Sequence, residues 1–309
     1  MNDTPRFNAH ILRMLWLMLL SVVFLACAGS ARKETLAVPQ TVPVEKQSVS
    51  QEEMSAPESP DPFAKEASAA TALAAATAPS DEPAWASGKE ELFYRMEFLG
   101  ITMGYARFHY KGKVSWNGKE TYHLSVRAWT SGLLSVFYPF DGTVEYFLDQ
   151  KTLAPLRQEF SGKMKDADYV AIFEQEKGKI VYRNKKTGVV RNEVDTPLNV
   201  YDPVTAAYYY RGRALGSEEP PRQVYAGRKI WQISMKPLGR EKIDTSLGPV
   251  EAVVMETVIT REGQVENNAG LKMWISGDAR HVPVRIHAKF RRIKMWTMEA
   301  ELMPPGERG

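Results

Sequence analysis

Apolar and polar residues alternate along most of the chain after residue 90. The stretches 94–98 (YRMEF), 121–128 (TYHLSVRA) and 282–291 (VPVRIHAKFR) each place an apolar side chain at every second position. This period of two puts the apolar side chains on one face of an extended strand and the polar ones on the other. Similar stretches lie near residues 105–115, 143–149, 153–162, 167–175, 178–184, 222–236, 250–260, 271–276 and 293–302. The pattern therefore predicts a mainly β domain.

Short polar segments with glycine separate these stretches, as in WNGKE around Asn117 and Gly118. Such a pair between two alternating segments favours a hairpin, and hence an antiparallel sheet. The same signal recurs around Gly178, Gly188 and Gly263. Because roughly eleven strands in one flat sheet would leave long open edges, we expect a curved antiparallel sheet that forms a barrel or half-barrel. Several Arg, Lys and Glu residues on the polar faces argue against a barrel that crosses a membrane.

Two segments favour a helix over a strand. Residues 202–215 (DPVTAAYYYRGRAL) begin with Asp202, a good N-cap, and continue with Pro203, which suits the first helical position. Residues 130–139 predict a short helical turn that ends before Pro139. The residues of the longer segment that we expect to face the sheet are Ala206, Ala207, Tyr210 and Leu215. The fold class is therefore a curved β-sheet with one or two short helices.

The first 26 residues have the order of charge and hydrophobicity that is typical of a secretory signal peptide. Arg6 and Arg13 precede an uncharged run from Met14 to Ala26. About 13 helical residues span only ~20 Å, which is short of the ~30 Å hydrocarbon core of a bilayer. We therefore predict a signal peptide over residues 1–26 and an exported protein, rather than a transmembrane anchor.

The only cysteine of the chain, Cys27, ends this segment in the sequence LLSVVFLACAGS. FLAC resembles a bacterial lipobox, which implies cleavage before Cys27 and acylation of its sulfur and new amino group. Phe24 departs from the Leu that the lipobox favours at that position. The alternatives are ordinary cleavage after Ala28, in an A-x-A arrangement with Ala26, and a chance cysteine. A lone cysteine forms no disulfide within the chain. With Ala28 and not Asp after it, the lipidated form resembles lipoproteins that are sorted to the outer membrane of Gram-negative bacteria.

The chain changes composition after the signal peptide. Residues 27–88 are rich in Ala, Pro, Ser and Glu and poor in aromatic residues. Such a segment buries too little apolar surface to offset the entropy of ordering it, so we predict a flexible tether with a reach of about 40–45 Å. We place the β-rich domain at residues 89–303 and a tail at 304–309.

Four motifs follow one another along the predicted domain. They are a pair of glycines (Gly100, Gly104), an Asp and a Pro around a strand start (Asp149, Pro155), the helix that begins at Asp202, and a W-x-x-x-D-x-x-x-x-P turn (Trp274, Asp278, Pro283). In this order they resemble the DUF 3108 family, a bacterial exported domain of unknown function, over residues 90–303. Glycine permits bends, Asp caps turns and Pro opens edge strands. The resemblance therefore implies a fold and an exported location, and no activity.

Charge adds one local feature to a chain whose formal net charge is only +3. Lys289, Arg291, Arg292 and Lys294 form a basic cluster near the C-terminus. The cluster could meet lipid phosphates, lipopolysaccharide or an acidic partner. The alternative is a solvated edge strand that its basic residues protect from aggregation. We do not expect an exported protein of this charge to bind nucleic acid.

The sequence carries little that indicates catalysis. It contains no phosphate-binding loop, no zinc-ligand spacing and no G-x-S-x-G motif. Asp278 and His281, in DARH, could form a general base. The alternative is a turn in which Asp278 caps its own backbone, followed by a surface histidine. We expect no catalytic site, no cofactor and no metal, and a hydrolase is the third hypothesis.

Aromatic residues and methionine are frequent in the domain, and a curved sheet can use them to hold an apolar ligand. The alternative is a core closed against the helix at Asp202. The predicted ligand-binding residues are Phe137, Tyr138, Phe140, Tyr209, Trp274 and Trp296, with Arg291, Arg292 and Lys294 at the rim. We therefore expect a non-catalytic envelope lipoprotein that binds a hydrophobic or amphipathic ligand in the periplasm. The main alternative is an interaction module that docks on another envelope protein or polymer through an open sheet edge.

Overall fold

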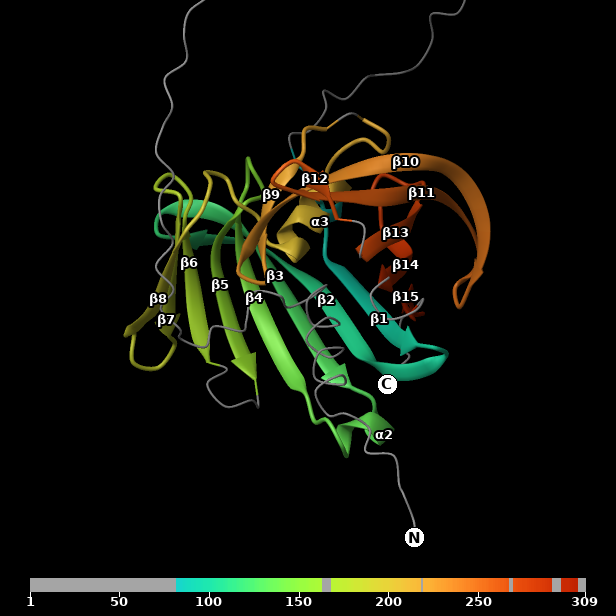
Figure 1. Ribbon diagram of the computed structural model, residues 1–309, viewed down its shortest axis with the longest axis horizontal. Helices are drawn as coiled ribbons and strands as arrows, with labels where there is room; N and C mark the ends of the chain where they lie inside the picture. The colour runs from blue at the N-terminus through green and yellow to red at the C-terminus, as the bar shows by residue number, and fades with distance from the viewer. Residues whose placement is uncertain (1–81, 163–167, 218, 267–268, 291–295, 305–309) are drawn as a thin grey trace, which may run out of the picture. The chain divides into compact units, whose positions relative to one another are not determined.

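The computed structural model describes residues 82–162, 168–217, 219–266, 269–290 and 296–304 (Figure 1). The predicted signal peptide, Cys27 and most of the predicted tether lie outside these residues. Three helical segments are present in them: η1 (Ala84–Ala86), α2 (Gly132–Ser135) and α3 (Pro203–Arg211).

The strands come in two groups, one before α3 and one after it. The first group is β1 (Glu90–Phe98), β2 (Ile101–Trp116), β3 (Lys119–Thr130), β4 (Asp141–Asp149), β5 (Pro155–Gly162), β6 (Tyr169–Glu174), β7 (Lys179–Asn184) and β8 (Val190–Asp195). The second group is β9 (Arg222–Ala226), β10 (Lys229–Thr245), β11 (Gly248–Arg261), β12 (Gln264–Val265), β13 (Ala269–Ser276), β14 (Pro283–Phe290) and β15 (Trp296–Leu302).

These strands form one antiparallel sheet in the order β8-β7-β6-β5-β4-β3-β2-β1-β15-β14-β13-β11-β10-β9, with β12 paired to β11. The first strand of the domain therefore pairs with the last one. Among the described residues, β8 and β9 are the two ends of this order, so the sheet is open and not a closed barrel. Figure 1 shows the strands before α3 as one curved layer, with α3 on its inner side and the long β10–β11 hairpin arching beside it. The predicted curved antiparallel sheet is confirmed, with fifteen strands where roughly eleven were expected.

The β2–β3 hairpin turns at the predicted pair. Asn117 and Gly118 have φ angles of 51° and 74°, and Trp116 pairs directly with Lys119. Two successive residues with positive φ are typical of a type I′ turn, whose twist matches that of the flanking strands. Asn tolerates this conformation and Gly adopts it freely, so the local sequence determines the turn.

Asp202 caps α3 as predicted. Its side chain accepts a hydrogen bond from the Thr205 backbone N–H, and the Thr205 hydroxyl accepts one from the Asp202 N–H, which completes a capping box. The helix ends at Arg211 because Gly212 follows, so the predicted helix over 202–215 is too long. Ala207 is exposed, and the prediction that it faces the sheet is wrong. The buried residues of α3 are Val204, Thr205, Ala206, Tyr208, Tyr209 and Arg211. The short helix predicted within 130–139 is α2.

The main core lies between α3, η1 and the inner face of β2–β7 and β9. Leu124 and Leu148 are fully buried in it. Trp85 is 1% exposed and packs edge-on against Tyr110, Tyr122 and Tyr208, with ring centroids 5.5, 5.3 and 4.9 Å away. Since Trp85 precedes residue 89, packed structure begins before the predicted domain boundary.

A buried ion pair ties α3 to strands that are distant in sequence. The Arg211 guanidinium donates to both carboxylate oxygens of Glu90, at 2.9 and 2.6 Å, and each side chain is 5% exposed. The same guanidinium donates to the carbonyls of Arg280 and His281, both at 3.2 Å. Arg211 therefore joins the end of α3 to the start of β1 and to the β13–β14 turn.

Candidate functional site

The inner face of the sheet continues past the main core onto β1, β15, β14, β13, β11 and β10. Because opposite residues of antiparallel strands share a face, the register defines two rows of side chains across these six strands. One row is Phe98, Met298, Ala288, Leu271, Thr257 and Met235. The other row is Met96, Ala300, Ile286, Met273, Met255 and Pro237. We call these two rows the methionine face.

Methionine dominates this face. It holds five of the seven described methionines, the other two being Met103 and Met303. Met255, Met273 and Met298 are 4%, 9% and 7% exposed, whereas Met96 and Met235 are half-buried. Methionine is unbranched and polarisable, so it adapts to apolar partners of different shapes. The face therefore offers an apolar surface that is not rigid.

The buried clusters on this face share no buried residue with the main core, although Met96 packs against both the main core and one of these clusters. Met255, Met273 and Ile275 form one of them, and Ala288 and Met298 form another. Leu215, from the loop after α3, packs against the first cluster. No residue of α3 itself belongs to either cluster.

A small cleft opens between the methionine face and the loop after α3. Its volume is about 20 Å³, and Tyr210, Arg213, Ala214, Leu215, Gly216, Ser217, Glu219, Met235, Met255 and Ile275 line it. Burial raises the pKa of Tyr210 to about 12, so this side chain is neutral and donates to the Ile233 carbonyl at 2.6 Å. The cleft has room for a water molecule and is far smaller than the ~300–1,000 Å³ of ligand pockets. A larger ligand would therefore have to lie along the face or displace the methionine side chains.

Four exposed apolar side chains lie in the segments that follow β1 and α2, at the strand ends beyond Phe98. They are Leu99, Ile101, Val136 and Phe137, with exposures of 66%, 62%, 75% and 71%. The first two follow β1, where Leu99 is next to Phe98. The last two follow α2, which is tied to β2 because Ser131 donates to the carbonyls of Met103 and Thr102, at 3.0 and 2.9 Å. We call these four residues the apolar rim.

The structure scatters the predicted ligand-binding residues. Phe137 belongs to the apolar rim, and Tyr138 beside it is half-buried. Phe140 and Tyr209 are 7% and 3% exposed within the main core. The side chain of Trp296 lies outside the described residues, as do Arg291, Arg292, Lys294 and Cys27. Their predicted roles stay predictions.

Trp274 lies on the opposite face from the methionine rows. It packs with Ile243, Val254 and Val284 in a cluster of its own, and its indole N–H donates to Glu241 Oε2 at 2.8 Å. Its neighbours in sequence, Met273 and Ile275, point to the inner face, since successive strand residues alternate. Trp274 therefore does not contribute to the same surface as the methionines.

The predicted ligand-binding residues include none of the methionines of this face. These are Met96, Met235, Met255, Met273 and Met298. Each of these occupies a place within a stretch for which a strand was predicted. The recurring methionine was therefore visible, although the pairing that brings the strands together was not.

Asp278 and His281 have different side-chain partners in the segment between β13 and β14. Asp278 accepts from the Ser276 hydroxyl at 2.8 Å and from the Arg280 backbone N–H at 3.2 Å. Burial opposes ionisation, but these bonds and the Arg280 guanidinium hold the pKa of Asp278 below its usual range. His281 Nδ1 lies 3.0 Å from the Arg211 carbonyl. The contacts agree with the turn interpretation of this segment.

A second group of polar residues lies on the outer face of β3 and β4. Glu145 accepts from Lys111 at 3.0 Å and from the Ser125 hydroxyl at 2.8 Å, and His123 Nε2 lies 2.7 Å from it. Burial opposes the effect, but these three groups lower the pKa of Glu145 to about 2. The carboxylate stands between serine and histidine, so the histidine is not placed to accept the serine proton as a catalytic base does. The group stabilises the pairing of the two strands.

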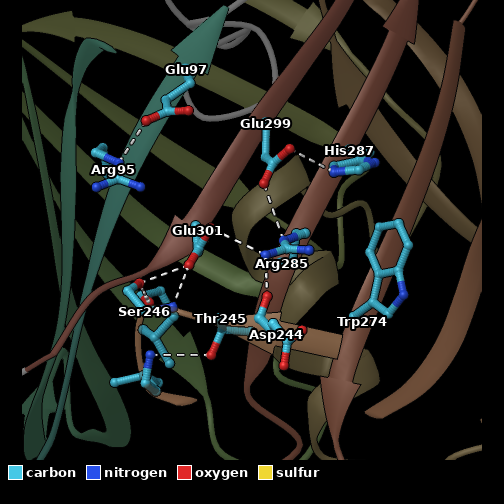
Figure 2. A network of polar contacts seen from close by, with 12 residues as sticks. Arg95, Glu97, Asp244, Thr245, Ser246, Trp274, Arg285, His287, Glu299 and Glu301 are labelled. Atoms are coloured by element: carbon cyan, nitrogen blue, oxygen red, sulfur yellow. Dashed lines mark hydrogen bonds and ion pairs between the residues drawn. The ribbon is translucent and has the colours of Figure 1, made fainter. Parts of the chain in front are cut away.

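A network on the outer face holds the tip of the β10–β11 hairpin against β14 and β15 (Figure 2). Glu301 accepts from the Ser246 backbone N–H and hydroxyl, at 2.6 and 2.7 Å. Arg285 donates to the Asp244 carbonyl at 2.6 Å and to Glu301 at 3.3 Å. Arg285 also forms an ion pair with Glu299, and the other carboxylate oxygen of Glu299 lies 2.9 Å from His287 Nε2. The hairpin that supplies Met235 and Met255 is therefore anchored at its tip.

Within the described part of the chain, no cluster of three or more His, Cys, Asp or Glu side chains is placed to hold a metal ion. The same residues include no helix whose length and apolar character would let it cross a bilayer.

Comparison with known proteins identifies a family and a group of distant structures. The family model described as "Protein of unknown function (DUF3108)" matches residues 93–291. No curated protein matches the sequence. A β-barrel-like protein of the domain of unknown function DUF1849 from Brucella abortus is 10% identical, with a TM-score of 0.45 over 70% of this chain and 95% of its own.

Two further solved structures are described as putative, an exported protein with a YmcC-like fold from Bacteroides fragilis and a lipoprotein from Parabacteroides distasonis. The first is 8% identical, with a TM-score of 0.29 over 69% of this chain and 92% of its own. The second is 9% identical, with a TM-score of 0.33 over 72% of this chain and 96% of its own. At such scores these likenesses carry no argument about function.

Proposed function

The chain belongs to the DUF3108 family, whose description assigns no activity, and from that premise we propose that it binds a hydrophobic or amphipathic ligand on the methionine face. The observation that carries the proposal is the pair of rows across six strands, in which methionine recurs at five positions. A sheet that needs only a closed core has no requirement for so many adaptable side chains at one place.

Binding on this face requires burial and no covalent chemistry. The removal of apolar surface from water contributes about 25 cal/mol of favourable free energy for each Å² that is buried. The half-buried Met96, Met235 and Leu271 have surface left to contribute to a ligand. The apolar rim supports entry from the β1 end, because exposed apolar side chains of this size are typical of contact with a ligand, a partner or a lipid surface.

The proposed setting is the bacterial envelope. A lipidated Cys27 would anchor the chain in the outer membrane, and residues 28–88 would let the domain move at some distance from it in the periplasm. The sequence alone supports this part. It predicts that, in a mass spectrum of the mature form of the full-length gene product, the chain begins at Cys27 and carries the added mass of acyl groups. A mass that starts at Gly29 without acyl groups would instead make it a free periplasmic protein.

Ligand binding is tested with full-length protein, an environment-sensitive apolar dye such as N-phenyl-1-naphthylamine, and competing oleyl alcohol. Met235→Gln and Met255→Gln each place a polar group of similar size on the face, and we expect roughly tenfold weaker binding of the dye. Met103→Gln is the control, because Met103 is also half-buried but lies outside the two rows. Thermal unfolding of each variant shows whether the fold is retained.

The outcomes are distinct. Weaker binding in the two face variants with unchanged binding in Met103→Gln supports the site. If the wild-type protein and the three variants bind the dye equally well, the ligand site lies outside the methionine face. A wild-type protein that binds neither dye nor alcohol contradicts the proposed function.

The exposed end of the sheet at β8 favours a second candidate, an interaction module. The β8 pattern is exposed at five of its six positions, and Val189 and Val190 are 62% and 41% exposed. A partner could add a strand there. This candidate predicts that Asn192→Pro, which interrupts the middle of β8, abolishes complex formation with an envelope partner and leaves dye binding unchanged.

A further inference from the structure

A basic side chain shares the cleft with the methionine face. Met235, Met255 and Ile275 line the cleft from the sheet, and Arg213 and Leu215 line it from the loop after α3. Met235 and Met255 also belong to the two rows, near their β10 end. An apolar surface and a guanidinium therefore meet at one opening.

Arg213 has no carboxylate partner among the residues that the structure describes. Its Nε atom is buried without a hydrogen-bond acceptor, and its guanidinium carbon lies 4.7 Å from the centroid of the Tyr209 ring. Arg222 lies over the same ring at 4.3 Å, but it also forms an ion pair of 3.5 Å with Glu219. A shielded guanidinium donor without an acceptor costs free energy, and an anion that accepts from it removes this cost.

Glu219 also lines the cleft, but other groups offset its charge. The Tyr209 hydroxyl donates to Glu219 Oε2 at 2.8 Å, and Arg222 pairs with the same oxygen. Among the side chains that the structure describes here, one carboxylate and two guanidinium groups leave an excess of positive charge, and Arg213 is the residue that carries it. The cleft therefore favours a negatively charged group.

We infer that the ligand is an anionic amphiphile, with a carboxylate or phosphate head at Arg213 and an apolar chain along the methionine rows toward the apolar rim. This inference rests on the proposed function, and it adds the class of ligand and its direction.

The dimensions of the sheet agree with this orientation. Five interstrand spacings of about 4.8 Å separate β10 from β1, which gives about 24 Å along the sheet. An acyl chain occupies about half of the ~30 Å hydrocarbon core of a bilayer. A chain of this kind with its head at Arg213 therefore fits within the rows.

The test compares oleate with oleyl alcohol, which share a chain and differ in charge, by displacement of the same dye from full-length protein. We expect Arg213→Gln to weaken oleate at least tenfold and to leave the alcohol unchanged. Arg183→Gln on β7 is the matched control and leaves both unchanged. Arg213→Lys, which keeps the charge without the fork of donors, should recover part of the oleate affinity.

Each result decides one of the two proposals. If wild-type protein binds neither compound, the proposed function fails. If it binds both but Arg213→Gln alters neither, or weakens both equally, the inference fails and the proposed function stands. Displacement of oleate by inorganic phosphate at equal concentration would also overturn the inference, because the site would then bind a free anion.

Discussion

The two halves of the inner face differ in the side chains that fill them. The main core under α3 is built from aromatic rings in fixed edge-on contacts and from branched residues such as Leu124 that have no exposed surface. The methionine face has one aromatic residue in its rows, Phe98, and several members that are only half-buried. Rigid side chains specify a single packing, whereas methionine permits several.

The two halves also differ in the buried charged side chains that they contain. Glu90, Asp202 and Arg211 are the buried charged residues of the described chain, and all of them contact or cap α3. The methionine face has one buried polar residue, Thr257, whose hydroxyl lies 3.4 Å from Met235 Sδ. From this comparison we expect stability to depend mainly on the half under α3, whereas the proposed binding belongs to the other half.

The largest expected effect comes from the contact that joins the halves. Glu90→Gln or Arg211→Met leaves one buried partner without its counter-charge, and we expect a loss of about 3–5 kcal/mol in the free energy of unfolding. Glu90→Gln combined with Arg211→Met removes both charges and should cost less than the sum of the single changes. Urea unfolding of the full-length variants measures these values. Additive costs would show that the pair does not act as a unit.

The next prediction compares packing directly. Leu124→Ala should cost about 2–5 kcal/mol, because it leaves a cavity in a fully buried site. Met235→Ala should cost less than half as much, since its side chain is half-buried and packs against the cluster of Met255, Met273 and Ile275 and not against the main core. Leu124→Met and Met235→Leu, which nearly conserve volume, are the controls and should each cost under about 1.5 kcal/mol. Equal costs for the two alanine variants would remove the distinction between the halves.

The sequence predicted features that depend on neighbouring residues. The faces of β1 and β3, the turn at Asn117 and the cap at Asp202 all follow from signals within a few positions. The second half of β10 was missed because Pro237 and Gly239 interrupt its alternation, and the strand passes them by a shift in register. Such a segment is typical of a loop when it is considered alone.

The methionine face required information that no local signal carries. Its rows exist because β1 pairs with β15, strands at opposite ends of the domain. Trp274 shows a second limit of local signals, which is the choice of face. It belongs to the outer cluster, whereas Met273, one position before it, lies on the inner face. Aromatic content indicated a ligand site, but only the order of the strands shows which residues can form one.

The third prediction uses the buried carboxyl of the half under α3. Burial raises the pKa of Asp202 to about 7 from 3.8, although hydrogen bonds from Thr205 oppose this. The folded state therefore binds a proton that the unfolded state has released, so stability falls as pH rises from about 4 to about 7. Between pH 5 and pH 8 the free energy of unfolding of the wild-type protein should therefore fall by roughly 2–3 kcal/mol more than that of Asp202→Asn, which keeps the cap but has no carboxyl to titrate. Parallel pH profiles for the two proteins would contradict the prediction.

The smallest effect concerns the support of the methionine face from outside. Glu301→Gln keeps the shape of the side chain but weakens its bonds to Ser246 and Arg285, at a cost of about 1–2 kcal/mol. Burial opposes ionisation, yet these partners hold the pKa of Glu301 below its usual range, so its contribution is present at neutral pH and is lost as pH falls below about 4. Hydrogen exchange should therefore quicken in residues 239–250, while the amides of β3 and β4 under α3 stay protected. Glu251→Gln, an exposed residue of the same hairpin, is the control. If exchange quickens equally across both halves, the hairpin tip is part of the cooperative core, and the methionine face is not an independent unit.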